Sequence, residues 1–241
     1  MMEILSAEGL VSLLTLTFLE IVLGIDNIIF ISIVSGRLPL NQQSKARNLG
    51  IILALGVRIL LLLAINWIIG LTATIFTINT FSLSYRDLIL VIGGLFLLAK
   101  STSEMHGKLE GKSEDHNVKV VTFRSALIQI VLLDLVFSLD SILTAVGLVE
   151  NVAIIIIAIV ISLGVMLAFS KKISTFINDH PTMKILAISF LLMIGMVLVM
   201  EGLHVHVPKG YIYFSMAFAL GVEVLNMKIR KKSGKKVTQK S

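Results

Sequence analysis

Four acidic residues lie inside apolar stretches of the chain and form a repeated pattern. The segment Glu20-Ile-Val-Leu-Gly-Ile-Asp26-Asn27 matches Asp134-Leu-Val-Phe-Ser-Leu-Asp140-Ser141 in residue type at each position. Carboxylate, amide and hydroxyl oxygens are hard donors, so this set suits Mn²⁺, Mg²⁺ or Ca²⁺ better than copper or a thiolate-bound zinc. The predicted metal ligands are Glu20, Asp26, Asn27, Asp134, Asp140 and Ser141. The alternative is that the acids are protonated or paired groups with a structural role.

The spacing of the acids limits how they can meet. Glu20 and Asp26 are six residues apart, which is about 9 Å along a helix axis and about 120° around it. A regular helix therefore cannot bring both onto one small ion. If the two motifs cross the membrane in opposite directions, Glu20 shares a depth with Asp140, and Asp26 shares one with Asp134. The sequence thus predicts an outer and an inner carboxylate layer on either side of the bilayer midplane.

Small residues separate the two acids of each motif. Gly24 and Ser138 could allow a local break that frees backbone carbonyls for the site. Small residues in membrane helices also simply permit close packing, so the sequence leaves the break open.

Other polar residues inside or beside the apolar stretches are candidates for supporting or gating roles. Arg58 is expected to neutralise one acid, or to move between acids when a metal leaves. Glu104 and His106 could guard an inner mouth, or belong to a solvated helix end. Glu223 and Asn226 share a helix face. The full supporting set is Arg58, Lys100, Glu104, His106, Glu201, Glu223 and Asn226.

Composition places these residues in a membrane protein. Of 241 residues, 56% are hydrophobic and only 15% are charged, and the mean hydropathy is +0.96. A soluble domain of this length needs more charge on its surface. We expect seven spans, the third of them short, at about Leu10–Val34, Leu49–Leu71, Asp87–Lys100, Ala126–Leu148, Val152–Ser170, Lys184–Leu203 and Tyr211–Met227.

Basic residues set the orientation of these spans. Of the 21 Lys and Arg residues, 18 fall in alternate loops and the tail, two fall on the other side, and Arg58 lies within a span. The positive-inside rule predicts an N-terminus outside and a C-terminus in the cytoplasm, in the cell membrane. The net charge of +6 therefore reflects orientation rather than nucleic-acid binding. Residues 228–241 form a basic cytoplasmic tail.

The repeated motif predicts an internal repeat within a single transmembrane domain, residues 1–227. Each repeat has three spans, at about residues 10–100 and 126–203, and residues 211–227 form an extra helix. An odd number of spans inverts the second repeat relative to the first. This all-α arrangement of inverted repeats is typical of secondary transporters, whose binding sites lie near the midplane between the repeats.

At these residues the chain resembles the TerC family of integral membrane proteins, of the short type without appended regulatory domains. The matching stretches are the two motifs, Gly93 to His106, Glu201 to Phe214, and Glu223 to Asn226, so that the resemblance covers essentially residues 10–227. The resemblance implies seven spans, membership of a wider group of small exporters, and a link to manganese export. Some members are linked to tellurite resistance, but an acidic site argues against carrying an oxyanion.

Three functions remain open at this stage. The first is export of a divalent cation, with Mn²⁺ favoured by the resemblance. The second is proton-coupled export of another small solute, with the acids as a proton relay. The third is a non-transporting membrane partner that helps deliver metal to exported proteins. The chain has no cysteine, which excludes thiolate sites. We find no nucleotide-binding or catalytic motif, so we expect neither an enzyme nor a tightly bound cofactor.

Overall fold

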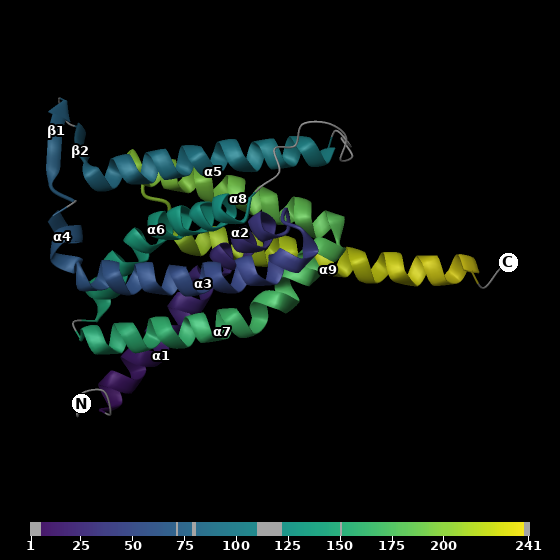
Figure 1. Cartoon of the computed structure of the whole chain (residues 1–241), viewed down its shortest axis with the longest axis horizontal. Coiled ribbons are helices and arrows are strands. Elements are labelled where there is room, and N and C mark those ends of the chain that lie inside the picture. Colours follow the sequence, from purple (N-terminus) through teal and green to yellow (C-terminus); the bar gives the residue numbers. More distant parts are fainter. Residues whose placement is uncertain (1–5, 71, 79–80, 110–121, 150, 239–241) are drawn as a thin grey trace.

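The protein is a bundle of α-helices with one small β-hairpin (Figure 1). The computed structural model describes residues 6–70, 72–78, 81–109, 122–149 and 151–238. The helices are α1 (Ala7–Leu23), α2 (Ile25–Ser35), α3 (Leu40–Leu63), α4 (Ile65–Gly70), α5 (Tyr85–Leu109), α6 (Phe123–Leu148), α7 (Val152–Asp179), α8 (Pro181–Gly202) and α9 (Lys209–Thr238). Strands β1 (Thr74–Ile78) and β2 (Phe81–Ser84) pair in antiparallel fashion.

Seven helical segments are long and apolar enough to cross a membrane, with α1 and α2 together forming the first. This number agrees with the number of spans expected from the sequence. Large apolar side chains such as Leu14, Phe18 and Phe214 are exposed on the outside of the bundle. Such residues are the surface that lipid requires, because lipid cannot satisfy backbone or side-chain polar groups.

Most helices are longer than the predicted spans, but α3 ends at Leu63, before the predicted end of the second span at Leu71. The third span is a full helix of 25 residues, α5, which continues past Lys100 to Leu109. The second begins at Leu40 rather than Leu49, and the seventh continues into the predicted tail as far as Thr238. Helical hydrogen bonding continues beyond the hydrocarbon, where polar side chains are solvated, so hydropathy marks only the lipid-contacting part of each helix.

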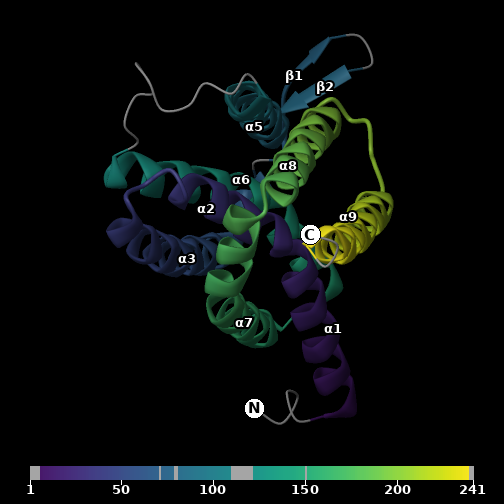
Figure 2. The same cartoon turned by 90° about the vertical axis from the view of Figure 1, so that its right-hand side faces the viewer.

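The first span is interrupted at Gly24, whereas α6 runs without a break through Ser138. The interruption is one residue long, and the Gly24 N–H still donates to the Glu20 carbonyl at 2.9 Å. Figure 2 shows the chain changing direction between α1 and α2. A Cβ atom on Gly24 would lie 2.6 Å from the sulfur of Met166 on α7. The glycine therefore serves close packing as well as the bend.

The helices of the two halves pack against each other in a regular pattern. α1 packs on α7, α3 packs on α6, and the most extensive helix contact joins α5 to α8. At the crossing of α5 and α8, a Cβ atom on Gly94 would lie 2.7 Å from the Gly195 carbonyl oxygen, and one on Gly195 would lie 3.1 Å from that of Gly94. Only glycine allows two helix backbones to approach so closely.

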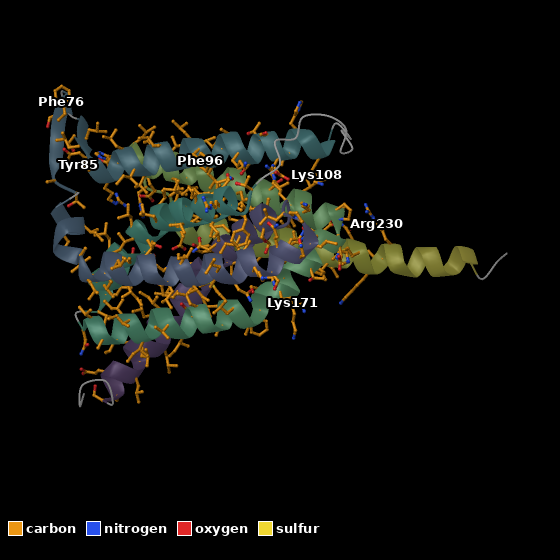
Figure 3. All side chains as sticks on the ribbon, viewed as in Figure 1. Phe76, Tyr85, Phe96, Lys108, Lys171 and Arg230 are labelled. Atoms are coloured by element: carbon orange, nitrogen blue, oxygen red, sulfur yellow. The ribbon has the colours of Figure 1, made fainter. Side chains whose placement is uncertain are left out.

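Charged residues divide between the two ends of the bundle. Lys108, Lys171 and Arg230 lie at one end, and Phe76 of the hairpin and Tyr85 lie at the other (Figure 3). The described N-terminal residues are at the hairpin end, and α9 projects beyond the bundle at the basic end (Figure 1). We refer below to the hairpin end and the basic end.

Candidate functional site

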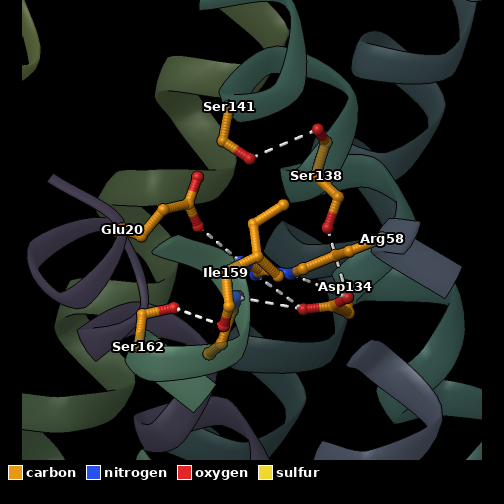
Figure 4. Close-up of polar contacts among 8 residues, drawn as sticks. Glu20, Arg58, Asp134, Ser138, Ser141, Ile159 and Ser162 are labelled. Atoms are coloured by element: carbon orange, nitrogen blue, oxygen red, sulfur yellow. Dashed lines mark hydrogen bonds and ion pairs between the residues drawn. The ribbon is translucent and has the colours of Figure 1, made fainter. Parts of the chain in front are cut away.

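Arg58 lies at the centre of a buried polar cluster that joins three helices (Figure 4). Its Nη1 donates to Glu20 Oε2 on α1 at 2.9 Å, and its Nη2 donates to Asp134 Oδ1 on α6 at 2.9 Å. Its Nε donates to Asp134 Oδ2 at 3.4 Å. The first acid of each repeated motif therefore binds the same guanidinium group, which α3 supplies.

Two further residues of the motifs hold Asp134. The Asn27 side-chain amide on α2 donates to Asp134 Oδ1 at 3.1 Å, and the Ser138 hydroxyl donates to Asp134 Oδ2 at 3.2 Å. Ser141 does not contact an acid among the described contacts; its hydroxyl donates to the Ser138 carbonyl at 3.2 Å. The interruption at Gly24 begins the helix that presents Asn27.

The cluster is buried and carries unequal charge. Glu20 and Arg58 are each 2% exposed, and Asp134 is 4% exposed. With both acids ionised, two carboxylates share one guanidinium, which leaves one negative charge. Ionised groups inside a bilayer are costly and usually serve a partner or an ion path. This arrangement stabilises Arg58 through three described hydrogen bonds to carboxylate oxygens.

The pairing differs from the predicted layers. Glu20 was expected at the depth of Asp140, but it reaches Asp134 through Arg58. The side chains of Asp26 and Asp140 lie outside the part of the structure that is described. Among the described residues, no group of three or more His, Asp or Glu side chains is arranged to hold a metal ion.

A further ion pair lies toward the basic end. Arg37, in the turn after α2, pairs with Glu104 on α5, and Glu104 is 8% exposed. Arg37, Glu104 and Lys100 line one small cavity. His106 is exposed. Burial lowers the pKa of the Arg37 guanidinium, although arginine remains charged in proteins. Glu104 thus has a defined partner that the sequence analysis did not identify.

The hairpin end carries two acid–histidine contacts. Glu201 Oε1 at the end of α8 lies 2.9 Å from His206 Nδ1, and Asp87 Oδ2 lies 3.0 Å from His204 Nε2. Asp87 also accepts hydrogen bonds from the backbone and hydroxyl of Ser84, at 2.8 and 2.6 Å, which caps the start of α5. The Ser84-x-x-Asp87 spacing of a capping box was a sequence signal for this role.

Glu223 and Asn226 lie apart from the buried cluster. The Asn226 amide donates to Glu223 Oε2 at 3.5 Å, and Thr182 at the start of α8 interacts with the Glu223 carboxylate. Arg58 is bound to Glu20 and Asp134 rather than to Glu223. The contacts of Glu223 join α9 to α8 at the basic end.

Comparisons with known proteins cover nearly the whole chain. Residues 5–237 match the family described as "Integral membrane protein TerC family". The chain is 49% identical to a UPF0053 protein of Haemophilus influenzae, over 93% of this chain and 95% of the relative. It is also 49% identical to the UPF0053 inner membrane protein YgdQ of Escherichia coli, over 91% of this chain and 92% of YgdQ.

A longer relative shares the same region. The UPF0053 inner membrane protein YoaE of Escherichia coli is 49% identical over 91% of this chain, and the match covers 43% of YoaE. No solved structure matches the chain. All residues of the buried cluster fall within the matched region.

Proposed function

Because the chain belongs to the TerC family of integral membrane proteins, we propose that it exports a divalent cation, with Mn²⁺ as its cargo. The protein is a multi-pass protein of the cell membrane, since its relatives are named inner membrane proteins and it has seven helical segments of membrane-spanning length. The acids Glu20 and Asp134 are the cation ligands of this proposal, and Arg58 competes with the cation for them.

The observation that carries the proposal is the sharing of one guanidinium by two buried acids. A static structural role is poorly served by buried charges, because apolar residues of similar volume generally stabilise a protein at least as well. The Arg58 guanidinium can neutralise the acids whenever the transported metal ion is not bound to them. Arg58 then holds the site together while it contains no cargo.

Charge balance favours a divalent cargo. Glu20 and Asp134 together carry two negative charges, which one divalent cation neutralises when Arg58 withdraws. In the arrangement described above, Arg58 neutralises only one of them, so uptake of one proton by the site completes the balance. An exchange of one divalent cation for Arg58 plus a proton therefore leaves the buried site neutral in both states. Proton coupling follows naturally from this scheme.

The choice of Mn²⁺ rests on ligand chemistry and on the family resemblance. The carboxylates and the Asn27 amide are hard oxygen donors, which suit Mn²⁺, Mg²⁺ and Ca²⁺. Asp26, Asp140 and Ser141 remain proposed ligands of the cargo-bound state. The family's link to manganese export selects Mn²⁺ among these cations.

We further propose that the two halves of the chain are inverted repeats that move against each other. The packing of α1 on α7, α3 on α6 and α5 on α8 supports this, because a two-fold operation that exchanges the halves also exchanges these contacts. The site then lies between the repeats, as in other transporters built in this way. Arg37 and Glu104 at the basic end close the cytoplasmic side in this scheme.

The test is Mn²⁺ uptake into inside-out vesicles that contain the purified protein. We expect uptake by the wild type, loss of uptake in Asp134→Asn and Glu20→Gln, and no change in Glu8→Gln, an exposed acid in the first turn of α1. Uptake no faster than in protein-free vesicles would contradict the proposal and favour another solute or a non-transporting role. Unchanged uptake in Asp134→Asn would remove the site from the mechanism.

A further inference from the structure

A cavity lies next to the Arg58 cluster, on its hairpin-end side. The cavity has a volume of about 70 Å³ and is lined mainly by apolar residues of α5, α8 and α9, together with Asn27, Arg58, Ser141 and Glu201. A water molecule occupies about 30 Å³ in the liquid, so the cavity can hold a small hydrated ion or a few waters. Its polar lining joins the buried cluster to the end of α8.

Asn27 lines this cavity and has a side-chain oxygen without a described partner. Its side chain is 4% exposed, and its Nδ2 donates to Asp134. Its Oδ1 has no hydrogen-bond partner among the described residues. Burying a carbonyl oxygen without a hydrogen-bond partner is unfavourable, so this oxygen is a candidate to bind a ligand. Since the amide nitrogen is committed to Asp134, only the oxygen is free to bind a ligand.

The other polar groups of the cavity also offer oxygen lone pairs. The Ser141 hydroxyl uses its proton on the Ser138 carbonyl, so its lone pairs remain available. Glu201 contributes a carboxylate. The described N–H bonds of Arg58 point to Glu20 and Asp134. A cation needs acceptors of this kind, whereas an anion needs donors.

We propose that this cavity is a second cation site, in which Asn27 Oδ1, Ser141 Oγ and the Glu201 carboxylate bind a partly hydrated divalent cation. The inference rests on the proposed export function and places this site between the buried acids and the outside. Asn27 belongs to both sites, because its nitrogen donates to Asp134 and the residue lines the cavity.

The second site is suited to release. It has a single carboxylate, fewer than the first site, and cation affinity falls as the number of charged ligands decreases. Glu201 lies 2.9 Å from His206, whose side chain is 76% exposed at the hairpin end. A cation held by Glu201 is therefore one side chain away from solvent.

The test compares Mn²⁺ on the two faces of inside-out vesicles. Mn²⁺ in the lumen meets the outer face and inhibits uptake when it occupies the second site. We expect Glu201→Gln to raise the luminal Mn²⁺ concentration for half-inhibition by about 10- to 100-fold, the range typical for loss of a metal-site partner. The KM for Mn²⁺ on the cytoplasmic face should stay within about twofold.

A second variant removes space rather than charge. Val197→Phe fills the cavity and should weaken luminal inhibition in the same way. Glu8→Gln and Val160→Phe are the controls, since Glu8 lies in the first turn of α1 and Val160 is 46% exposed on α7. Unfolding midpoints in detergent check that each variant is folded.

The outcomes separate the two proposals. Wild-type protein that takes up no Mn²⁺ contradicts the export function itself. Normal uptake with luminal inhibition unchanged in both Glu201→Gln and Val197→Phe overturns the second site, and the cavity then holds water only. Complete loss of uptake in Glu201→Gln also overturns it, because an exit ligand acts on release rather than on entry.

Discussion

At the scale of single residues, the protein depends on how Arg58 is shared. Two acids on helices α1 and α6 hold one guanidinium on α3, so three distant parts of the chain meet through charged hydrogen bonds. Without the Arg58 guanidinium, the carboxylates of Glu20 and Asp134 would be buried together with no described positive charge between them. Removing one partner of a buried ion pair is strongly destabilising, whereas replacing the whole pair by uncharged residues often is not.

We therefore predict that Arg58→Met lowers the free energy of unfolding by about 3–5 kcal/mol. The triple variant Glu20→Gln/Arg58→Met/Asp134→Asn should recover most of this loss, because it leaves no unpaired charge, while remaining inactive in transport. Chemical unfolding in detergent measures the effect, with the exposed Arg124→Met as the control. A triple variant as unstable as Arg58→Met would mean that the ion pairs are the main support of the fold.

The sequence predicted that Arg58 neutralises an acid within the membrane, but not that it binds Glu20 and Asp134 together. Apolar surroundings alone identified Glu20, Arg58 and Asp134. Their pairing depends on the bend at Gly24 and on the depth of each helix in the bundle, which arise from packing between distant segments. The sequence analysis assumed straight helices and therefore predicted Glu20 and Asp134 in different carboxylate layers. It did not allow for the long Arg58 side chain that contacts both acids.

At the scale of helices, the crossing of α5 and α8 is the closest described approach of the two halves. Gly94 and Gly195 face each other with no room for side chains, and a Cβ atom on Gly202 would lie 2.7 Å from the Asp87 carbonyl oxygen. If the two halves move as units, helices α5 and α8 must either slide along each other at this crossing or keep the crossing unchanged.

We predict that Gly94→Leu separates α5 from α8 and destabilises the protein by about 1–3 kcal/mol or more, the usual cost of overpacking. Gly164→Leu is the matched control, because a Cβ atom there meets nothing within 4 Å. The unfolding midpoints of both variants in detergent give the comparison. Equal midpoints for the two leucine variants would contradict a tight crossing.

Hydropathy predicted the number of membrane helices but not all of the elements. The segment from Thr74 to Ser84 forms a β-hairpin that the sequence analysis missed. Its β-branched and aromatic residues, such as Thr74 and Phe76, favour strands, but a short hairpin gives little periodic signal. The third predicted span ended before Ser101 and Glu104, which are polar but buried within the protein, Glu104 in an ion pair with Arg37.

At the scale of the whole molecule, the distribution of basic residues predicts how the helix bundle is oriented across the membrane. Lys108, Lys171 and Arg230 gather at one end, opposite the hairpin (Figure 3). The positive-inside rule puts this end in the cytoplasm. The site and the second cavity then follow one another toward the outside.

We predict that a cysteine at the hairpin, Ser82→Cys, reacts with a membrane-impermeant thiol reagent in intact cells, whereas Arg124→Cys at the basic end reacts only after the membrane is opened. The chain contains no cysteine of its own, so each variant reports a single position. The reverse pattern of labelling would invert the orientation and, with it, the proposed direction of transport.

The central claim, that Arg58 and the cargo compete for Glu20 and Asp134, is tested most directly by equilibrium binding of Mn²⁺ to purified protein. The account predicts that Asp134→Asn abolishes binding and that Arg58→Gln binds Mn²⁺ more tightly than the wild type, because the competing cation is gone. Equal or weaker binding in Arg58→Gln, or wild-type binding in Asp134→Asn, would contradict it.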